Sequence, residues 1–291
     1  MPRKTMRPIT LSRVIKICSI ALNRGKIDTD IITKELKISY RRAKNLLLEL
    51  ERMKLLCKLN QRYIPNRNTY EFLENIKEKI WRNIHLYFYE NYVFYRKFVQ
   101  ILEKHKYDEK GLNSKEIIKE AKSMNLNLNI VAVEVLTDWC IRLSVIQRNL
   151  YNGNIYLLNT QVPSCSIFIG ILLKCYDRLS LGKRISKIYV EIPKLREEVC
   201  EIAKIKRCIF NEMLKKIYQE NIGRVELSGA PLISLASRSP LYQKKMIILT
   251  SSSNEIYPKF FSEKRREGLK INRKIYYYIA IHDKRLRCPR N

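Results

Sequence analysis

Apolar residues recur along the chain at helical spacing, and each helical set is followed by a short β-rich segment. In the first set, the apolar positions predict a helix that begins at Thr10. Asp28 or Thr29 is placed to cap a second helix, and Ser39 is placed to cap a third. A hairpin-like run follows over residues 57–64. The predicted order is therefore three helices and a small two-stranded hairpin.

A second set with the same order follows. It begins with a long helical stretch over residues 69–105, in which aromatic residues are concentrated. The remaining predicted elements are a helix over 115–124 capped by Ser114, a helix over 130–143 capped by Asn129, and strands over 145–150 and 155–158. Asn152-Gly153 lies between these strands and is a preferred pair for a tight hairpin turn.

The third set has an unusual hairpin. Its predicted elements are a helix over 166–179, a strand over 188–190, helices over 194–203 and 206–219, and a strand over 224–227. We expect the strand over 224–227 to pair with the distant segment 273–281. The intervening residues are rich in Ser, Lys and Arg, and they are too numerous for an ordinary turn. They predict an enlarged, partly mobile wing.

These sets predict a mainly α fold with small β-hairpins, in the α+β class, built from tandem domains. We expect a first domain over 1–68 with a basic N-terminal arm. A linker helix and second domain should occupy 69–162, and a third domain with an enlarged basic wing should occupy 163–291.

The charge of the chain points to a polyanionic partner. Its 291 residues include 57 Lys and Arg against 28 Asp and Glu, a formal net charge of +29. Residues 1–80 carry +11, residues 81–160 carry +3 and residues 161–291 carry +15. Because the excess lies at the two ends, we expect the flanking domains to meet the polyanion.

The helix that follows Ser39 carries the most specific chemistry. On a helical wheel one side carries Ala43, Leu46, Leu47, Leu50 and Lys54, and the other carries Arg41, Lys44, Asn45 and Arg52. Arg suits the O6 and N7 atoms of guanine, and Asn suits the N6 and N7 atoms of adenine. This face therefore predicts base reading, against the alternative of an ordinary solvated helix face. Arg42 at its flank suits a phosphate, and Tyr40 either reaches phosphate or covers the helix end.

Basic residues on either side of this helix extend the predicted surface. Lys58 and Arg62 surround the turn of the short hairpin, which suits contact with a neighbouring phosphate. Arg3, Lys4 and Arg7 lie on a Pro-punctuated N-terminal segment. Such an arm can lie in a minor groove, but a disordered solubilising tail is the favoured interpretation.

The corresponding helix of the second set has the opposite character. Residues 130–140 are apolar on most faces and contain Glu134 and Asp138 without a base. Carboxylates repel phosphate, so we expect this set to act as a spacer or to form a homodimer. The alternative is that the aromatic helix of the same chain buries it.

The third set has Lys-rich cationic surfaces suited to phosphate contact rather than base reading. The candidate residues are Lys206, Arg207, Lys215 and Lys216 on its third helix, and Lys264, Arg265 and Arg266 in its wing. Tyr276 and Tyr278 share one side of a strand and could stack on bases, although core packing is the favoured interpretation.

Several other classes of function have no support in the sequence. No phosphate-binding Gly-rich loop or nucleophile motif occurs, so we expect no enzyme activity and no cofactor. The eight cysteines lack CxxC spacing and the three histidines are scattered, so we expect free thiols and no metal site. No apolar run approaches the roughly 20 residues of a membrane-spanning helix. We expect a cytoplasmic, nucleoid-associated protein.

The order of elements over residues 10–65 resembles the winged helix-turn-helix superfamily, and residues 98–158 and 166–281 look like variants of it. The Lys-, Ile- and Asn-rich, Gly-poor composition resembles that of tandem winged-helix proteins of archaea and their viruses, replication initiators among them. The resemblance implies that Arg41, Arg42, Lys44 and Asn45 enter a groove of DNA and that Arg62 touches phosphate. The second set departs from this pattern at its acidic third helix.

The sequence therefore favours a double-stranded DNA-binding protein that acts in transcription regulation, replication or chromatin. Two alternatives stay open. One is an RNA- or single-strand-binding module that uses the aromatic and basic C-terminal segment. The other is a protein-interaction scaffold built from winged helices.

Overall fold

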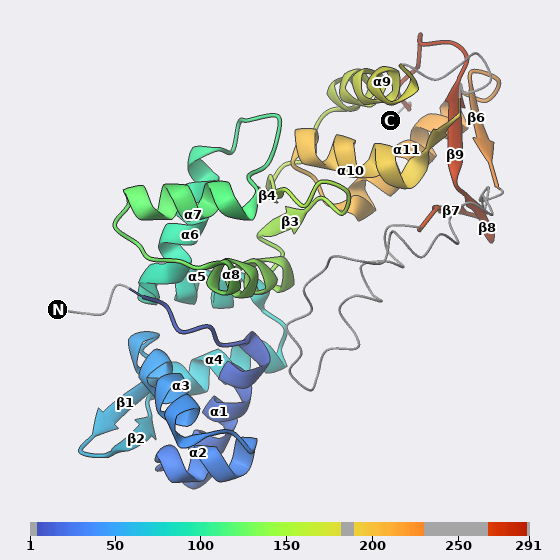
Figure 1. Cartoon of the computed structure of the whole chain (residues 1–291). Helices are drawn as coiled ribbons and strands as arrows, with labels where there is room; N and C mark the ends of the chain where they lie inside the picture. The colour runs from blue at the N-terminus through green and yellow to red at the C-terminus, as the bar shows by residue number, and fades with distance from the viewer. Residues whose placement is uncertain (1–4, 182–188, 230–266, 290–291) are drawn as a thin grey trace, which may run out of the picture. The chain divides into compact units, whose positions relative to one another are not determined.

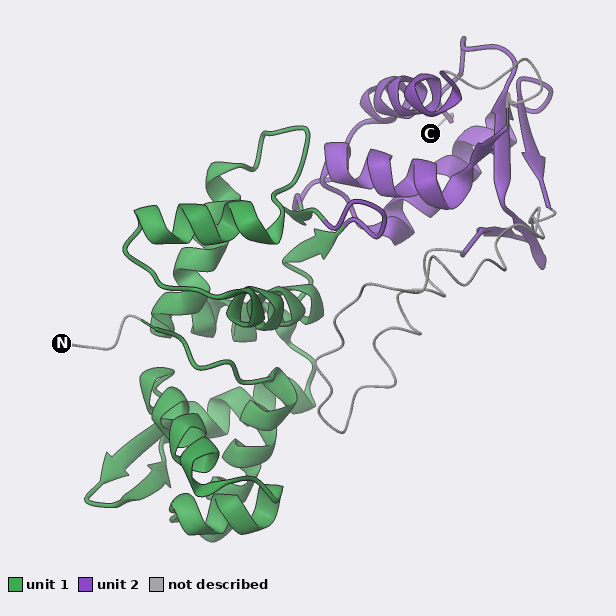
Figure 2. Cartoon of the chain, viewed as in Figure 1, with its two compact units in different colours: residues 1–148, 154–158 green, residues 149–153, 159–291 purple. Residues whose placement is uncertain are grey.

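The computed structural model describes residues 5–181, 189–229 and 267–289. Contacts divide the chain into two compact units, unit 1 with residues 1–148 and 154–158, and unit 2 with residues 149–153 and 159–291 (Figure 2). The fold is mainly helical with small antiparallel hairpins, which confirms the predicted α+β class. The division into three domains stays a prediction, because contacts within one chain do not test independent folding.

Unit 1 contains two successive sets of helices, each followed by a two-stranded hairpin (Figure 1). In chain order its elements are α1 (Leu11–Arg24), α2 (Thr29–Leu36), α3 (Tyr40–Arg52), β1 (Leu56–Leu59), β2 (Arg62–Pro65), α4 (Arg67–Lys77), α5 (Trp81–Asn91), α6 (Val93–Lys104), α7 (Ser114–Ser123), α8 (Ile130–Arg142), β3 (Ile146–Arg148) and β4 (Ile155–Leu157).

Unit 2 contains a third set, in which a three-stranded antiparallel sheet replaces the hairpin. Its described elements are α9 (Cys165–Ser180), β5 (Val190–Glu191), α10 (Ile192–Ala203), α11 (Arg207–Glu220), β6 (Val225–Ser228), β7 (Leu269–Ile271), β8 (Lys274–Tyr276) and β9 (Tyr278–Ile281). The strand β6 pairs with β9 from Val225–Ile281 to Ser228–Tyr278. This pairing confirms the predicted long-range partner of the strand after α11.

All three sets share one pairing rule. The residue or strand just before the second helix pairs with the returning strand of the hairpin. These pairs are Ile27 with Tyr63, Leu112 with Ile155, and β5 with β9. Each set therefore has a small antiparallel sheet that joins the start of its second helix to the hairpin.

Polar caps fix where the helices begin. The Oδ1 atom of Asp28 accepts a hydrogen bond from the backbone of Ile31 at 2.9 Å, as expected for a cap of α2. Ser39 is the cap of α3, also as predicted. For α7 the cap is Asn113 rather than the predicted Ser114. Asn113 and Glu116 form a reciprocal capping box, so one more polar side chain is bonded there than a serine cap would provide.

The predicted long helix over 69–105 is three helices, α4, α5 and α6. The chain breaks at Lys79, which has a left-handed backbone (φ 60°), and at Tyr92, which is extended (φ −120°, ψ 101°). The apolar period continues across both breaks, because all three helices contribute to one core. A periodicity argument cannot detect such turns.

Aromatic residues form the centre of unit 1. The ring of Trp139 from α8 lies 4.9 Å from that of Phe88, and Tyr92 and Tyr95 also contact it. The Nε1 atom of Trp139 donates a hydrogen bond to the carbonyl of Ile9 at 3.1 Å. The apolar side of α8 is thus buried by aromatic residues of the same chain, as the alternative interpretation expected. A homodimer through this region stays a prediction.

The described helices are all too short or too polar to cross a membrane.

The eight cysteines are free thiols. Four of them are buried within helices (Cys18, Cys140, Cys175 and Cys200), and Cys57, Cys208 and Cys288 are exposed.

Candidate nucleic-acid interface

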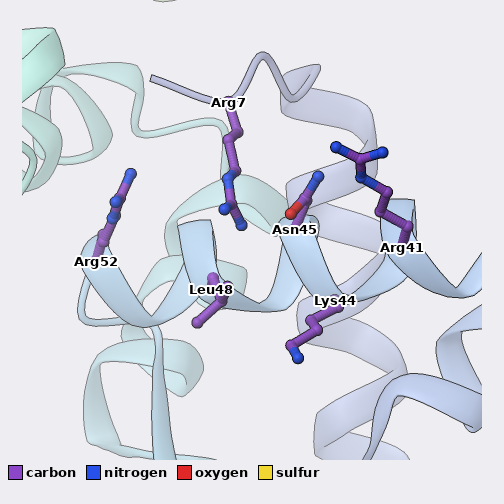
Figure 3. A pocket seen from close by; sticks show the side chains of 6 residues that line it. All are labelled: Arg7, Arg41, Lys44, Asn45, Leu48 and Arg52. Atoms are coloured by element: carbon purple, nitrogen blue, oxygen red, sulfur yellow. The ribbon is translucent and has the colours of Figure 1, made fainter. Parts of the chain in front are cut away.

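The helix α3 separates its residues into an inner and an outer side. Ala43, Leu46, Leu47 and Leu50 are buried in the core of unit 1. The outer stripe, defined here as Arg41, Lys44, Asn45, Leu48 and Arg52, follows the helical repeat on the other side. Together with Arg7 these residues line a groove of about 670 Å³ (Figure 3). The predicted assignment of faces is therefore present in the folded chain.

The N-terminal half of α3 presents cations that have no partner among the residues that the structure describes. Arg41, Arg42 and Lys44 are exposed, as is Tyr40, with 54% of its surface accessible. Within the described part of the chain, no carboxylate pairs with any of these three basic side chains. Their charge is therefore available to an external anion.

The N-terminal segment packs against the body of unit 1. Met6 and Ile9 are buried, at 2% and 1% exposure, and Thr5 forms a parallel bridge with Asn127. The expectation of a disordered tail is wrong for residues 5–9, because two apolar side chains anchor them. Arg3 and Lys4 lie outside the described residues. Arg7 extends from this segment toward α3 (Figure 3).

A buried carboxylate fixes this segment to α3. Glu49 is fully buried and accepts hydrogen bonds from the Tyr92 hydroxyl at 2.5 Å and from Arg52 Nη1 at 3.1 Å. The backbone of Arg7 also donates to it. Burial raises the pKa of Glu49, and the bonds from Tyr92 and Arg52 oppose that rise. Glu49 thus ties the N-terminal segment, α3 and the start of α6 together.

Arg52 has an internal role that the sequence did not predict. Its Nη1 atom also donates to the carbonyl of Thr5 at 3.2 Å. Its side chain is 27% exposed and paired with Glu49. Arg52 therefore holds the N-terminal segment at the end of the groove, and its guanidinium is less available than that of Arg41.

The hairpin β1–β2 carries the two predicted basic residues on an exposed projection. Leu59 pairs with Arg62 across a two-residue turn, in which Asn60 has a left-handed backbone (φ 55°). Asn tolerates this conformation better than most residues. Lys58 and Arg62 are exposed, and the hairpin extends away from the helices (Figure 1).

One cation near α3 was missed at the sequence level. Arg13 of α1 lies close enough to Arg42 that burial and this neighbouring charge together lower its pKa. Two guanidinium groups held near one another repel unless an anion lies between them. No sequence pattern places Arg13 beside Arg42, since 29 positions separate them.

The corresponding helix of the second set is electrically neutralised. In α8, Glu134 pairs with Arg148 at 2.8 Å and Asp138 pairs with Arg142 at 2.9 Å. The acids that were expected to repel phosphate therefore each have a basic partner. This face has no excess cation.

The third helix of unit 2 has its first arginine engaged internally. Arg207 makes two hydrogen bonds of 2.6 Å to the carboxylate of Glu197, which is 1% exposed. Glu197 also accepts from the backbone of Leu150 at 3.0 Å. Arg207 is therefore a structural ion-pair partner and not the exposed cation that the sequence predicted. Glu197 lies on another helix, where a wheel of α11 cannot show it.

The lysines of α11 remain on the surface to different degrees. Lys206 and Lys216 are exposed, and Lys215 is half-buried. The predicted wing residues Lys264, Arg265 and Arg266 lie outside the described residues, as does most of the predicted wing.

The strands β7 and β8, which follow the predicted wing residues in the sequence, form a basic hairpin. Between β7 and β8, Asn272 and Arg273 both have left-handed backbones (φ 51° and 64°), which is the geometry of a type I′ turn. Lys270 and Lys274 are exposed beside Arg273. Tyr276 and Tyr278 are half-buried, and Tyr278 pairs in the sheet with Ser228.

The part of the chain that the structure describes contains no group of three or more His, Cys, Asp or Glu side chains that could hold a metal ion. The groups of the α3 face are exposed guanidinium and ammonium groups and the half-buried carboxamide of Asn45, which bind anions and base edges. No protein-family model matches the chain, and no curated protein matches its sequence.

Proposed function

We propose that the chain is a double-stranded DNA-binding protein built from tandem winged helix-turn-helix units. In this proposal α3 is the recognition helix and β1–β2 is its wing. The order of three helices and a hairpin, with the strand residue before the second helix paired to the returning strand, supports this assignment. Regulation of transcription, DNA replication or chromatin organisation are the roles that such binding would serve.

One observation carries the proposal. Three helices occupy the same place in three repeats, and α3 has the densest cationic surface among them: Arg41, Arg42 and Lys44 lie within four residues, are exposed and pair with no carboxylate among the described residues, whereas α11 has Lys216 exposed and Lys215 half-buried. The acids of α8 are paired, and Arg207 of α11 is paired with Glu197. A surface of unpaired cations on a helix is the feature that duplex DNA would neutralise.

The dimensions of α3 fit this role. Its 13 residues span about 20 Å, and the major groove of B-DNA, about 12 Å wide, admits a helix. Arg41 and Asn45 lie one turn apart and face the same way, so they would reach base edges. Arg42 and Lys44 lie at the margins and would contact phosphates. Lys58 and Arg62 of the wing would bind the next phosphates along the strand.

The decisive experiment separates base reading from charge. Arg41→Ala with Asn45→Ala should lose about 1–3 kcal/mol of sequence discrimination per base contact while retaining binding to unrelated duplexes. The measurement is an unbiased selection of bound duplexes, followed by affinities for selected and scrambled sequences. A matched control is Arg67→Ala with Asn83→Ala, which removes an exposed Arg and Asn elsewhere in unit 1. Unchanged discrimination in the first variant would remove the reading role of α3.

Competition between duplex and single-stranded nucleic acid distinguishes duplex binding from the two alternative functions. An RNA- or single-strand-binding protein would prefer the unpaired strand of the selected sequence over its duplex. A scaffold would show no nucleic-acid binding at moderate salt. The half-buried state of Tyr276 and Tyr278 makes base stacking on them less favourable than it would be on exposed rings.

A further inference from the structure

One residue of the outer stripe of α3 is apolar. Arg41, Lys44, Asn45 and Arg52 are polar or charged, whereas Leu48 lies among them in the lining of the groove. Its neighbours Leu46 and Leu47 are buried in the core, but Leu48 is only half-buried. A surface that served phosphate alone would gain nothing from an apolar group at its centre.

We propose that Leu48 contacts the 5-methyl group of a thymine in the bound duplex, an inference that rests on the proposed function. The thymine methyl group is the one apolar group that the four bases present in the major groove. Leu48 lies three residues after Asn45, about 4.5 Å further along the helix axis, which is close to one base-pair step of 3.4 Å. The helix would thus read a thymine next to the base pair that Asn45 contacts.

Arg7 lies next to the surface that the thymine would occupy. Its side chain extends from the N-terminal segment over the same stretch of α3 as Leu48 (Figure 3). The segment is held by the buried Met6 and Ile9 and by the hydrogen bond from the Arg7 backbone to Glu49, so the backbone of Arg7 is fixed beside the groove. A base edge that reaches Leu48 would therefore lie beside the side chain of Arg7.

A simpler role for Leu48 makes a different prediction. Leu48 could only pack against the aliphatic part of Arg7 and so position the N-terminal segment. In that case the leucine would matter for binding, but the methyl group of the DNA would not. The two roles are separated by changing the methyl group on the DNA and the leucine on the protein independently.

The test uses the full-length chain and the duplex obtained by selection. Each thymine is replaced in turn by deoxyuridine, which lacks only the methyl group, and the dissociation constants are measured. At one position the wild type should bind the uracil duplex roughly three- to five-fold more weakly, the effect expected from leaving one methyl group in water. Leu48→Ala should bind both duplexes equally, and Leu48→Met should keep the preference.

The control variant is Leu86→Ala, which removes a leucine that is 43% exposed on α5 and should leave the ratio as in the wild type. Equal binding of thymine and uracil duplexes by the wild type at every position would overturn the contact, while the duplex-binding function would stand. An equal loss by Leu48→Ala on both duplexes, with the wild-type ratio retained, would also overturn it. A wild type that binds no duplex would overturn both proposals.

Discussion

Glu49 places a carboxyl group inside unit 1, between the N-terminal segment and the aromatic core. Burial raises its pKa, and the carboxyl accepts from Tyr92, Arg52 and the backbone of Arg7. At the scale of single residues, this carboxyl decides where Arg7 lies. It therefore shapes the groove without lining it.

The ionisation of Glu49 gives a pH dependence of stability with a defined sign. Between the ordinary pKa of 4.5 and the raised pKa of the folded state, the folded chain holds a proton that the unfolded chain has released. The free energy of unfolding contributed by this group therefore falls as pH rises from 4.5 through the raised pKa. The glutamine of Glu49→Gln cannot ionise, so the variant should not lose this part of its free energy of unfolding as pH rises. The wild-type stability minus that of the variant should fall across this window in urea denaturation at a series of pH values.

A second variant sharpens the result. Tyr92→Phe removes a hydrogen-bond donor that favours the ionised form of Glu49, so the window should extend to higher pH. A stability difference between wild type and Glu49→Gln that stays constant with pH would refute the buried carboxyl as its source.

The three corresponding helices α3, α8 and α11 differ chiefly in their partners. In α8 basic residues neutralise two acids, and in α11 a buried glutamate holds the leading arginine. In the N-terminal half of α3, Arg41, Arg42 and Lys44 lack such partners within the described residues. At the scale of elements, the same position in a repeat is structural in one set and open to a ligand in another.

This difference predicts opposite outcomes for two arginine substitutions. Arg207→Ala would remove the closer of two guanidinium partners of the buried Glu197 carboxylate, the other being Arg196 at 3.9 Å, and should destabilise the protein on the order of 3 kcal/mol. Arg41→Ala removes an exposed side chain from a helix and should change stability by less than about 0.5 kcal/mol. Urea denaturation measures the stability of the two variants. Their DNA affinities should show the opposite pattern, with the larger loss in Arg41→Ala. A destabilisation of similar size in both would contradict the distinction.

At the scale of the whole molecule, a net charge of +29 gives strong attraction to any polyanion. Such attraction is not by itself specific, because phosphate contacts carry no sequence information. Specificity therefore depends on the few residues of α3 that could reach base edges. The remaining cations would set affinity and its response to salt.

The salt dependence should separate these roles. The logarithm of the binding constant should fall linearly with the logarithm of salt concentration. Lys58→Ala with Arg62→Ala should make this slope shallower by about 2, with sequence preference unchanged. The control Lys119→Ala with Lys122→Ala removes two exposed lysines of α7 and lowers net charge equally. An identical slope in both variants would show that total charge, and not the wing, controls affinity.

Much of the fold could be predicted from local signals. Caps such as Asp28 and Ser39, and the apolar repeat of α3, are properties of a few neighbouring residues. The exposed face of α3 followed from the same repeat. Signals of this kind fail where a turn has no marker. Lys37 and Lys204 end α2 and α10 in left-handed conformations that glycine normally adopts.

The sequence by itself determined the helical repeats, the α+β class and the cationic outer face of α3, because local periodicity and side-chain chemistry encode these features. Tertiary structure alone decided which charges were free. It paired Arg207 with Glu197 and Arg52 with Glu49, and it brought Arg7 to the groove. Such pairing depends on which segments pack together, which local sequence does not specify. The energy of each charge then depends on its distance to neighbouring charges and on its burial.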